Sequence, residues 1–361
     1  MGSKAITRRD FLNQEITAKE AQPSTQRKKK TQNRTAWAII LFGPVLLVLL
    51  MAVSITYGAA KISIATVWEA IFHFNNEILH HLIIVDLRLP RVIASALVGA
   101  AFAVAGAIMQ GTTRNPMADS GLLGLNSGAG FALSICFAFF PGMGYMKIVL
   151  FSFSGAALGA GLVSAAASLR RGGATPMRLI LAGAAVSALL SALSQGIAIY
   201  FNVAQDIMFW TVGGVAGSTW DQVKVMTPWI AAALLGAAML SPSISLLSLG
   251  EDVAKGLGLN TVLINGLCSL LVLVLAGTSV AVVGAVGFVG LIIPHLARYL
   301  VGVDYRRIIP SSAVLGALLM VMADLGSRTL NPPFETPIGA LISLVGVPFF
   351  LYLARKQRRA L

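Results

Sequence analysis

The chain has 361 residues, of which 57% are hydrophobic and only 11% are charged, and its formal net charge is +13. Soluble domains carry roughly 25% charged residues, so this composition excludes an ordinary water-soluble protein. The basic residues gather at the two ends, nine in the first 35 positions and four in the last seven, whereas positions 36–354 hold 14 basic and 11 acidic residues. Basic ends on an apolar body indicate the cytoplasmic flanks of a membrane protein and argue against a nucleic-acid partner.

The N-terminal part is predicted to be a basic cytoplasmic tail followed by a membrane span. Residues 1–35 include a run of four basic residues at 27–30, and we expect this tail to be disordered and attracted to anionic membrane lipids. Residues 36–57 carry no charge, and a helix of this length covers a hydrocarbon core of about 30 Å. A secretory signal would lie closer to the start of the chain, so this first span is expected to stay uncleaved.

Polar breaks divide the chain into ten candidate transmembrane helices. They cover residues 36–57, 91–110, 121–140, 147–169, 177–201, 222–241, 260–280, 284–301, 308–328 and 337–354. Ten crossings place both ends on one side, and a cytoplasmic placement puts 21 cations inside and six outside, in accord with the positive-inside bias. The sequence therefore predicts an all-α polytopic membrane protein, with a transmembrane domain over residues 36–354 and a basic cytoplasmic C-terminus over 355–361.

Two segments outside the membrane are expected to be helices that do not cross it. Between Thr66 and Leu82, apolar residues fall on one helical face and polar residues on the other, a pattern typical of a helix lying in the membrane interface. Residues 205–220 contain an apolar Met-Phe-Trp run near several glycines, and they are predicted to form a second short helix that caps a pathway.

Small residues crowd the predicted spans. Because helix association in lipid depends on close packing, we expect glycines at helical spacing to let helix backbones approach one another. The clearest of these positions are Gly124, Gly128, Gly155 and Gly159.

Signatures of enzymes and of metal sites are missing from the sequence. No Gly-x-x-x-x-Gly-Lys-Ser/Thr loop is present, so ATP binding by that route is not expected. The four histidines are scattered, and Cys136 and Cys268 both lie inside apolar spans, which argues against a metal site and against a disulfide framework. We therefore expect no catalytic residue, no metal and no cofactor.

Ionisable residues are nearly absent from the interiors of the spans. Asp324 is the main exception, and it lies four residues before Arg328, so a local ion pair on one helix face would explain it. Ion-coupled transporters usually carry ionisable groups at mid-membrane, so a neutral pathway better fits a bulky solute moved by external machinery. We expect that pathway to be lined by Gln110, Asn126, Ser127 and Asn265.

Several longer motifs follow one another at consistent spacing over residues 58–354. They are 87–91 (LRLPR), 106–110 (GAIMQ), 114–124 (RNPMADSGLLG), 126–130 (NSGAG), 249–259 (LGEDVAKGLGL), 287–298 (GFVGLIIPHLAR), 323–328 (ADLGSR) and 335–339 (ETPIG). Together they resemble the FecCD-type permeases of ABC importers for ferric siderophores, haem and cobalamin. The resemblance implies the type II ABC importer permease fold in a bacterial cell membrane. It also implies a second permease subunit, identical or related, two separate ATPase subunits, and an extracytoplasmic substrate-binding lipoprotein.

The resemblance also implies roles for two sets of residues. Arg88, Arg91 and Arg328 match arginines that dock acidic residues of the binding protein, and a guanidinium group can hold a carboxylate by two hydrogen bonds. The alternative is that they are ordinary interface arginines that contact lipid headgroups. Segment 249–259 matches the region that couples to the ATPase, and without the resemblance a plain amphipathic loop helix would be the better interpretation. Its candidate coupling residues are Gly250, Glu251, Asp252, Leu257 and Gly258.

Two departures from the family pattern concern the same loop, because Ser120 stands where proline is usual and Met117 replaces a common leucine.

The expected cargo is a ferric siderophore, with haem or cobalamin as alternatives within the family. A secondary transporter driven by an ion gradient is the alternative from another class. A membrane-anchored interaction protein is disfavoured, because ten spans far exceed what an anchor needs.

Overall fold

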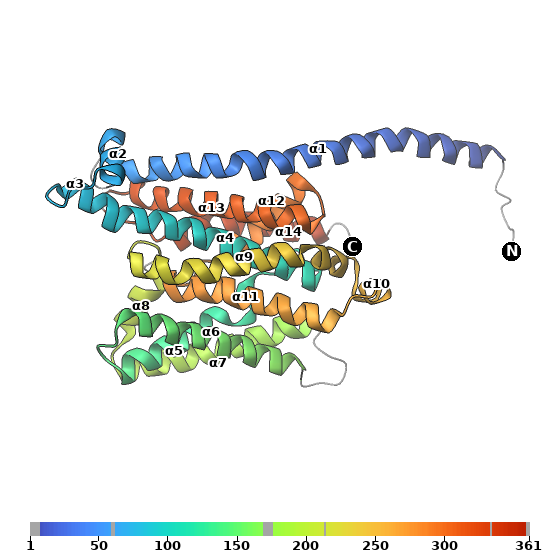
Figure 1. The fold of residues 1–361 in the computed structure, drawn as a ribbon. Helices are drawn as coiled ribbons and strands as arrows, with labels where there is room; N and C mark the ends of the chain where they lie inside the picture. Colours follow the sequence, from blue (N-terminus) through green and yellow to red (C-terminus); the bar gives the residue numbers. More distant parts are fainter. Residues whose placement is uncertain (1–7, 59–61, 169–175, 213, 333, 359–361) are drawn as a thin grey trace.

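A computed structural model of the chain describes residues 8–58, 62–168, 176–212, 214–332 and 334–358. Within these ranges the structure is helical, with turns and loops between the helices and no strand. The long helices lie side by side along one common axis, with α1 (Arg8–Thr56) at one edge and α5 (Leu125–Phe139), α6 (Tyr145–Ser168) and α7 (Pro176–Tyr200) at the opposite edge (Figure 1). The all-α membrane fold predicted from the hydropathy pattern is confirmed.

Each of the ten predicted spans coincides with a helix. Besides those four, they are α4 (Leu89–Thr113), α9 (Trp220–Leu249), α11 (Thr261–Val283), α12 (Val289–Val301), α13 (Tyr305–Thr329) and α14 (Ile338–Arg358). Seven helical stretches in the described part are long and apolar enough to cross a membrane, whereas α5, α12 and the apolar part of α14 are shorter. Ten crossings and a shared side for the two ends therefore stay predictions.

The N-terminal segment differs from the expected disorder. The backbone of α1 is helical from Arg8, so that residues 8–35 continue the first span, and residues 1–7 lie outside the described part. The segment is rich in Lys, Arg and Gln, which have high helix propensity, and an existing helix extends more easily than a new one begins. The boundaries 1–35, 36–354 and 355–361 remain a prediction, and residues 359–361 also lie outside the described part.

Short helices lie at the two ends of the bundle. Figure 1 shows α2 (Ile64–Phe72), α3 (Leu79–Leu82) and α8 (Ala204–Val212) at one end, and α10 (Glu251–Gly256) at the other end. The expected surface helix within 205–220 is confirmed in its first part as α8. The single interfacial helix expected over 66–82 is wrong, because His73 leaves helical geometry and the Asn75 amide donates a hydrogen bond to Nδ1 of His81.

The core of the bundle forms around α4, most of whose residues are buried. Glycines set its closest contacts, because a Cβ on Gly99 would overlap the carbonyl oxygen of Gly316 on α13, and one on Gly106 would overlap the backbone of Gly290 on α12. The glycines singled out on α5 and α6 behave as expected. A Cβ on Gly128 would overlap the carbonyl oxygen of Gly155, so the two backbones touch there.

Candidate functional site

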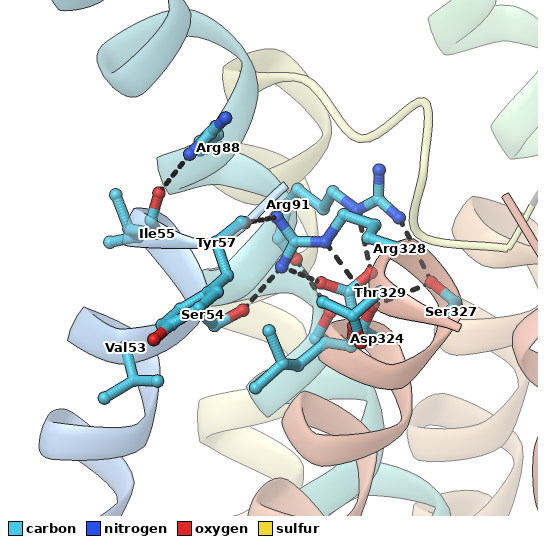
Figure 2. A network of polar contacts seen from close by, with 12 residues as sticks. Val53, Ser54, Ile55, Tyr57, Arg88, Arg91, Asp324, Ser327, Arg328 and Thr329 are labelled. Carbon is cyan, nitrogen blue, oxygen red and sulfur yellow. Dashed lines mark hydrogen bonds and ion pairs between the residues drawn. The ribbon is translucent and has the colours of Figure 1, made fainter. Parts of the chain in front are cut away.

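A cluster of charged side chains lies at the α2 and α3 end of the bundle, where three helices meet. Arg88 ends the π-helical segment η1 (Ile83–Arg88), Arg91 lies one turn later in α4, and Arg328 lies in the last turn of α13. Three residues along a helix bring Arg88 and Arg91 to neighbouring positions on its surface, and the glycine contact between α4 and α13 brings Arg328 beside them. The structure therefore gathers the three arginines that the sequence singled out (Figure 2).

Asp324 is the centre of this cluster. Its side chain is fully buried, Oδ1 accepts a hydrogen bond from Nε of Arg91 at 2.7 Å, and Oδ2 accepts one from Nη2 of Arg328 at 2.8 Å. The pair with Arg328 spans one helical turn and is the local ion pair that the sequence predicts. The pair with Arg91 joins α13 to α4 and was not predicted, because nothing local in the sequence places these two residues together.

Arg91 has a second acidic partner, Glu335, in the segment between α13 and α14. Its Nη1 donates to Oε1 of Glu335 at 2.7 Å and its Nη2 to Oε2 at 3.0 Å, a two-pronged pair of the kind that guanidinium and carboxylate groups form best. Nη2 also contacts Oγ of Ser327 at 3.4 Å. Glu335 belongs to a motif noted in the sequence, but no role was expected for it.

The other two arginines bind the end of α1. Arg328 donates from Nη1 to the carbonyl oxygen of Tyr57 at 3.2 Å and from Nη2 to Oγ of Ser54. Arg88 donates from Nη1 to the carbonyl oxygen of Ile55. The last carbonyl groups of a helix lack partners within it and carry its partial negative charge, so cations at this position satisfy and stabilise the end of α1.

The cluster is therefore mostly buried and internally paired in the single chain. Arg88, Arg91 and Arg328 are each only 7% exposed, and they tie α1, α4 and α13 together. Their three positive charges meet two carboxylates, so the cluster of five side chains keeps a formal charge of +1. A docking role for the three arginines stays a prediction, and such docking would have to exchange partners with groups already present.

The expected coupling segment lies at the opposite end of the molecule (Figure 1). Glu251 and Asp252 begin α10, and Glu251 pairs with Lys255 at 2.9 Å and accepts a hydrogen bond from Oγ1 of Thr261. The hydrogen bond and the charge of Lys255 lower the pKa of Glu251 below its ordinary value. Leu257 lies just after this helix and is 63% exposed.

A glycine lies on each side of α10. Gly250 precedes α10 with φ 132°, and Gly258 follows it with φ 84°, both in the left-handed region that residues with a side chain rarely adopt. These two glycines allow the sharp turns into and out of α10, which packs against α9 and leaves Leu257 exposed at its end. This geometry suits a contact with a partner, and the coupling role itself stays a prediction.

The four expected pathway residues have different surroundings. Gln110 is 2% exposed, and its Nε2 donates to the carbonyl oxygens of Gly290 and Leu291 on α12, each at 3.3 Å. Pro294 has no amide hydrogen, so the carbonyl group of Gly290 lacks its usual helical partner, and Gln110 supplies one. Oε1 of Gln110 accepts a hydrogen bond from Arg298 at 3.2 Å. This glutamine therefore binds α4 to α12.

The other three expected pathway residues lie away from the contact between α4 and α12. Oγ of Ser127 is 3.1 Å from Oγ of Ser187 on α7, and Asn126 is partly exposed beside it on α5. Asn265 lines a cavity of about 480 Å³ near α10, together with Arg114 and Glu251. A pathway that includes all four residues remains a prediction.

Comparisons with known proteins agree with this architecture. The sequence profile of the FecCD transport family matches residues 46–356. The iron(3+)-hydroxamate import system permease protein FhuB of Bacillus subtilis is 50% identical, over 99% of this chain and 97% of its own. The hemin transport system permease protein HmuU of Yersinia pestis is 36% identical, over 87% of this chain and 94% of its own.

A solved structure supports the fold. It is described as an inward-facing conformation of a metal-chelate type ABC transporter, and it superposes with a TM-score of 0.77 at 29% identity. The match covers 88% of this chain and 99% of the solved one.

Proposed function

This chain belongs to the FecCD transport family, and from that premise we propose that it is the membrane-spanning permease subunit of an ATP-driven importer for ferric siderophores. As a member of this family it is a multi-pass membrane transport component and not an enzyme. The observation that carries the proposal is the family match over residues 46–356, which includes both the arginine cluster and the α10 segment.

The positions of the two candidate contact regions support transport in one direction through the helix bundle. The arginine cluster lies at one end of the helix bundle and α10 at the other (Figure 1). A loaded binding protein would dock at the first end, through Arg88, Arg91 and Arg328. ATP-driven closure of the partner subunits would push on residues 249–259 at the second end. Because α10 connects α9 to α11, this push would tilt helices that pack on α4 and would switch access from outside to inside.

The proposed assembly contains two ATPase subunits, a second permease subunit that is identical or related, and an extracytoplasmic binding lipoprotein. Importers of this kind keep the site of ATP hydrolysis on separate subunits, and the chain has no phosphate-binding loop of its own. Lipid surrounds the assembly in the bacterial cell membrane.

The cargo follows from the relatives. The 50% identical protein imports iron(3+)-hydroxamate by its name, which supports a ferric siderophore, and the hemin permease at 36% identity keeps haem as the second candidate. Uptake of radiolabelled ferric hydroxamate into right-side-out vesicles tests this choice. Excess unlabelled ferric hydroxamate should suppress the labelled uptake, and excess haem should not.

The energy source is tested in the same vesicles, which carry the chain together with its ATPase subunits and binding protein. Uptake should require internal ATP and should persist when a protonophore collapses the proton gradient at constant ATP. Loss of uptake on adding the protonophore would instead support the ion-coupled class of transporter.

A further inference from the structure

Glu335 differs from the other acid of the arginine cluster in its exposure. Asp324 is fully buried and holds both Arg91 and Arg328, so it is part of the packed interior. The side chain of Glu335 is 44% exposed, and among the described residues its hydrogen-bond and ion-pair partner is Arg91. Arg91 would therefore keep its internal anchor if Glu335 left, and the face of its guanidinium group now covered by Glu335 would open to solvent.

The backbone around Glu335 is held in place, so the side chain is the part that can move. The Thr336 amide donates a hydrogen bond to the carbonyl oxygen of Ser327 at 2.9 Å, and Pro337 follows, with its fixed φ, just before α14. Rotation about the side-chain bonds of Glu335 can release Arg91 without moving the ends of α13 and α14.

A cavity of about 420 Å³ borders this ion pair. Arg91, Ser327 and Glu335 form one wall, and Met208 and Phe209 of α8 form another. Both α8 side chains are strongly exposed, and α8 lies at the same end of the bundle as α2 and α3 (Figure 1). Its guanidinium wall and apolar wall together fit an acidic side chain whose methylene groups would contact Met208 and Phe209.

Charge complementarity points to the same occupant. Three arginines and two carboxylates leave a formal charge of +1, and withdrawal of Glu335 would leave +2 beside a cavity large enough for a second carboxylate. One two-pronged pair would replace another of the same kind, so an exchange removes no hydrogen bond from Arg91.

We propose that Glu335 occupies, on Arg91, the place of a carboxylate of the docked binding protein, and that docking inserts an acidic side chain into this cavity and displaces Glu335. This inference rests on the proposed function and deepens it, because it makes Glu335 an internal competitor that weakens capture of the binding protein. A purely structural role for Glu335 would have the opposite sign, since losing it would loosen Arg91 and impair capture.

The test measures capture of the siderophore-loaded binding protein by the intact permease–ATPase complex in nanodiscs, using surface plasmon resonance at low salt. Glu335→Gln keeps the size of the side chain and removes its charge, and we expect the dissociation constant to fall by about threefold to tenfold. Asp221→Asn is the matched control, because Asp221 is an exposed acid at the start of α9 that pairs with Lys224. It removes the same charge without touching Arg91 and should leave capture nearly unchanged.

A second variant keeps the inference falsifiable if Glu335→Gln fails to assemble. Glu335→Asp retains the charge but shortens the reach to Arg91, so capture should tighten by a smaller factor. Unchanged or weaker capture in the variant that assembles would overturn the inference, and so would equal tightening in Asp221→Asn.

The double reversal Arg88→Glu with Arg328→Glu distinguishes the docking role of the arginine cluster from the competitor role of Glu335. If it abolishes capture while Glu335→Gln changes nothing, docking at the cluster stands and the competitor role falls. If the double reversal leaves capture unchanged, both the docking role of the cluster and the competitor role of Glu335 are wrong.

Discussion

Arg91 and Asp324 lie 233 positions apart in the sequence and form an ion pair of 2.7 Å in the interior of the helix bundle. The same carboxylate binds Arg328 through its other oxygen, so one buried acid holds two buried cations. Through these two arginines it connects α4, α13 and the end of α1. Two of the three arginines of the proposed docking cluster are thus held by one carboxylate, whereas Arg88 is held by the end of α1.

Asp324→Asn should therefore destabilise the protein strongly. Removing one partner of a buried pair typically costs about 3–5 kcal/mol, because the remaining charge stays buried without compensation. Thermal unfolding of the detergent-solubilised chain measures the effect. Asp221→Asn, at an exposed pair, should change the unfolding temperature little. Equal stability of the two variants would show that the buried cluster contributes nothing to the fold.

Gly106→Ala should weaken the packing of α4 on α12. The added methyl group would overlap the backbone of Gly290, which cannot move aside as a flexible side chain can, and overpacking of this kind costs about 1–3 kcal/mol. Gly196→Ala on α7 is the matched control, since a Cβ there meets nothing within 4 Å, and alanine favours a helix over glycine. The same unfolding assay should rank Gly106→Ala below the unchanged chain and Gly196→Ala level with it or above it.

Leu257→Asp should weaken the contact between this chain and the ATPase subunits without unfolding the chain. Leu257 is exposed at the end of α10, so a charge there costs the isolated subunit little, but it would spoil an apolar contact with the ATPase. Substrate-stimulated ATPase activity and uptake of the reconstituted complex should both fall by at least tenfold. Val303→Asp, an exposed apolar position in the loop between α12 and α13, should keep both activities. Full activity in Leu257→Asp would remove α10 from the coupling role.

The Glu251–Lys255 pair predicts a pH dependence of α10. Because Lys255 lowers the pKa of Glu251 in the folded state, the stabilisation is fully present above the ordinary glutamate pKa of about 4.3 and is lost as the pH falls through the lowered value. Hydrogen exchange of α10, corrected for the intrinsic effect of pH, should show constant protection from pH 7 down to about 4.5 and weaker protection below. Glu251→Gln should show no such step, and an identical step in that variant would assign the effect to another group.

Local patterns in the sequence were enough to predict the helices and some of the contacts along them. Hydropathy located all ten long helices, because the apolar length of a span is a property of consecutive residues. The pair of Asp324 with Arg328 was predicted because it needs only helical spacing. The helix expected over 66–82 was wrong, since periodicity alone does not report the turn held by Asn75 and His81.

Contacts between distant segments could not be predicted in this way. Glu335 binds Arg91 only because the loop before α14 folds back onto α4, and no spacing rule relates the two residues. Gln110 was expected to line a pathway because it is a polar residue in a span. In the structure it satisfies a carbonyl group that Pro294 leaves without a donor, a role that needs the partner helix to be known.

In the proposed function, this chain provides a passage and receives its driving force from ATPase subunits in the cytoplasm. The most direct measurement compares proteoliposomes containing the chain alone with proteoliposomes containing the full complex, both supplied with loaded binding protein and internal ATP. Only the full complex should accumulate radiolabelled ferric siderophore above the external concentration. Accumulation against a gradient by the chain alone would show that it does not depend on ATPase subunits for its driving force.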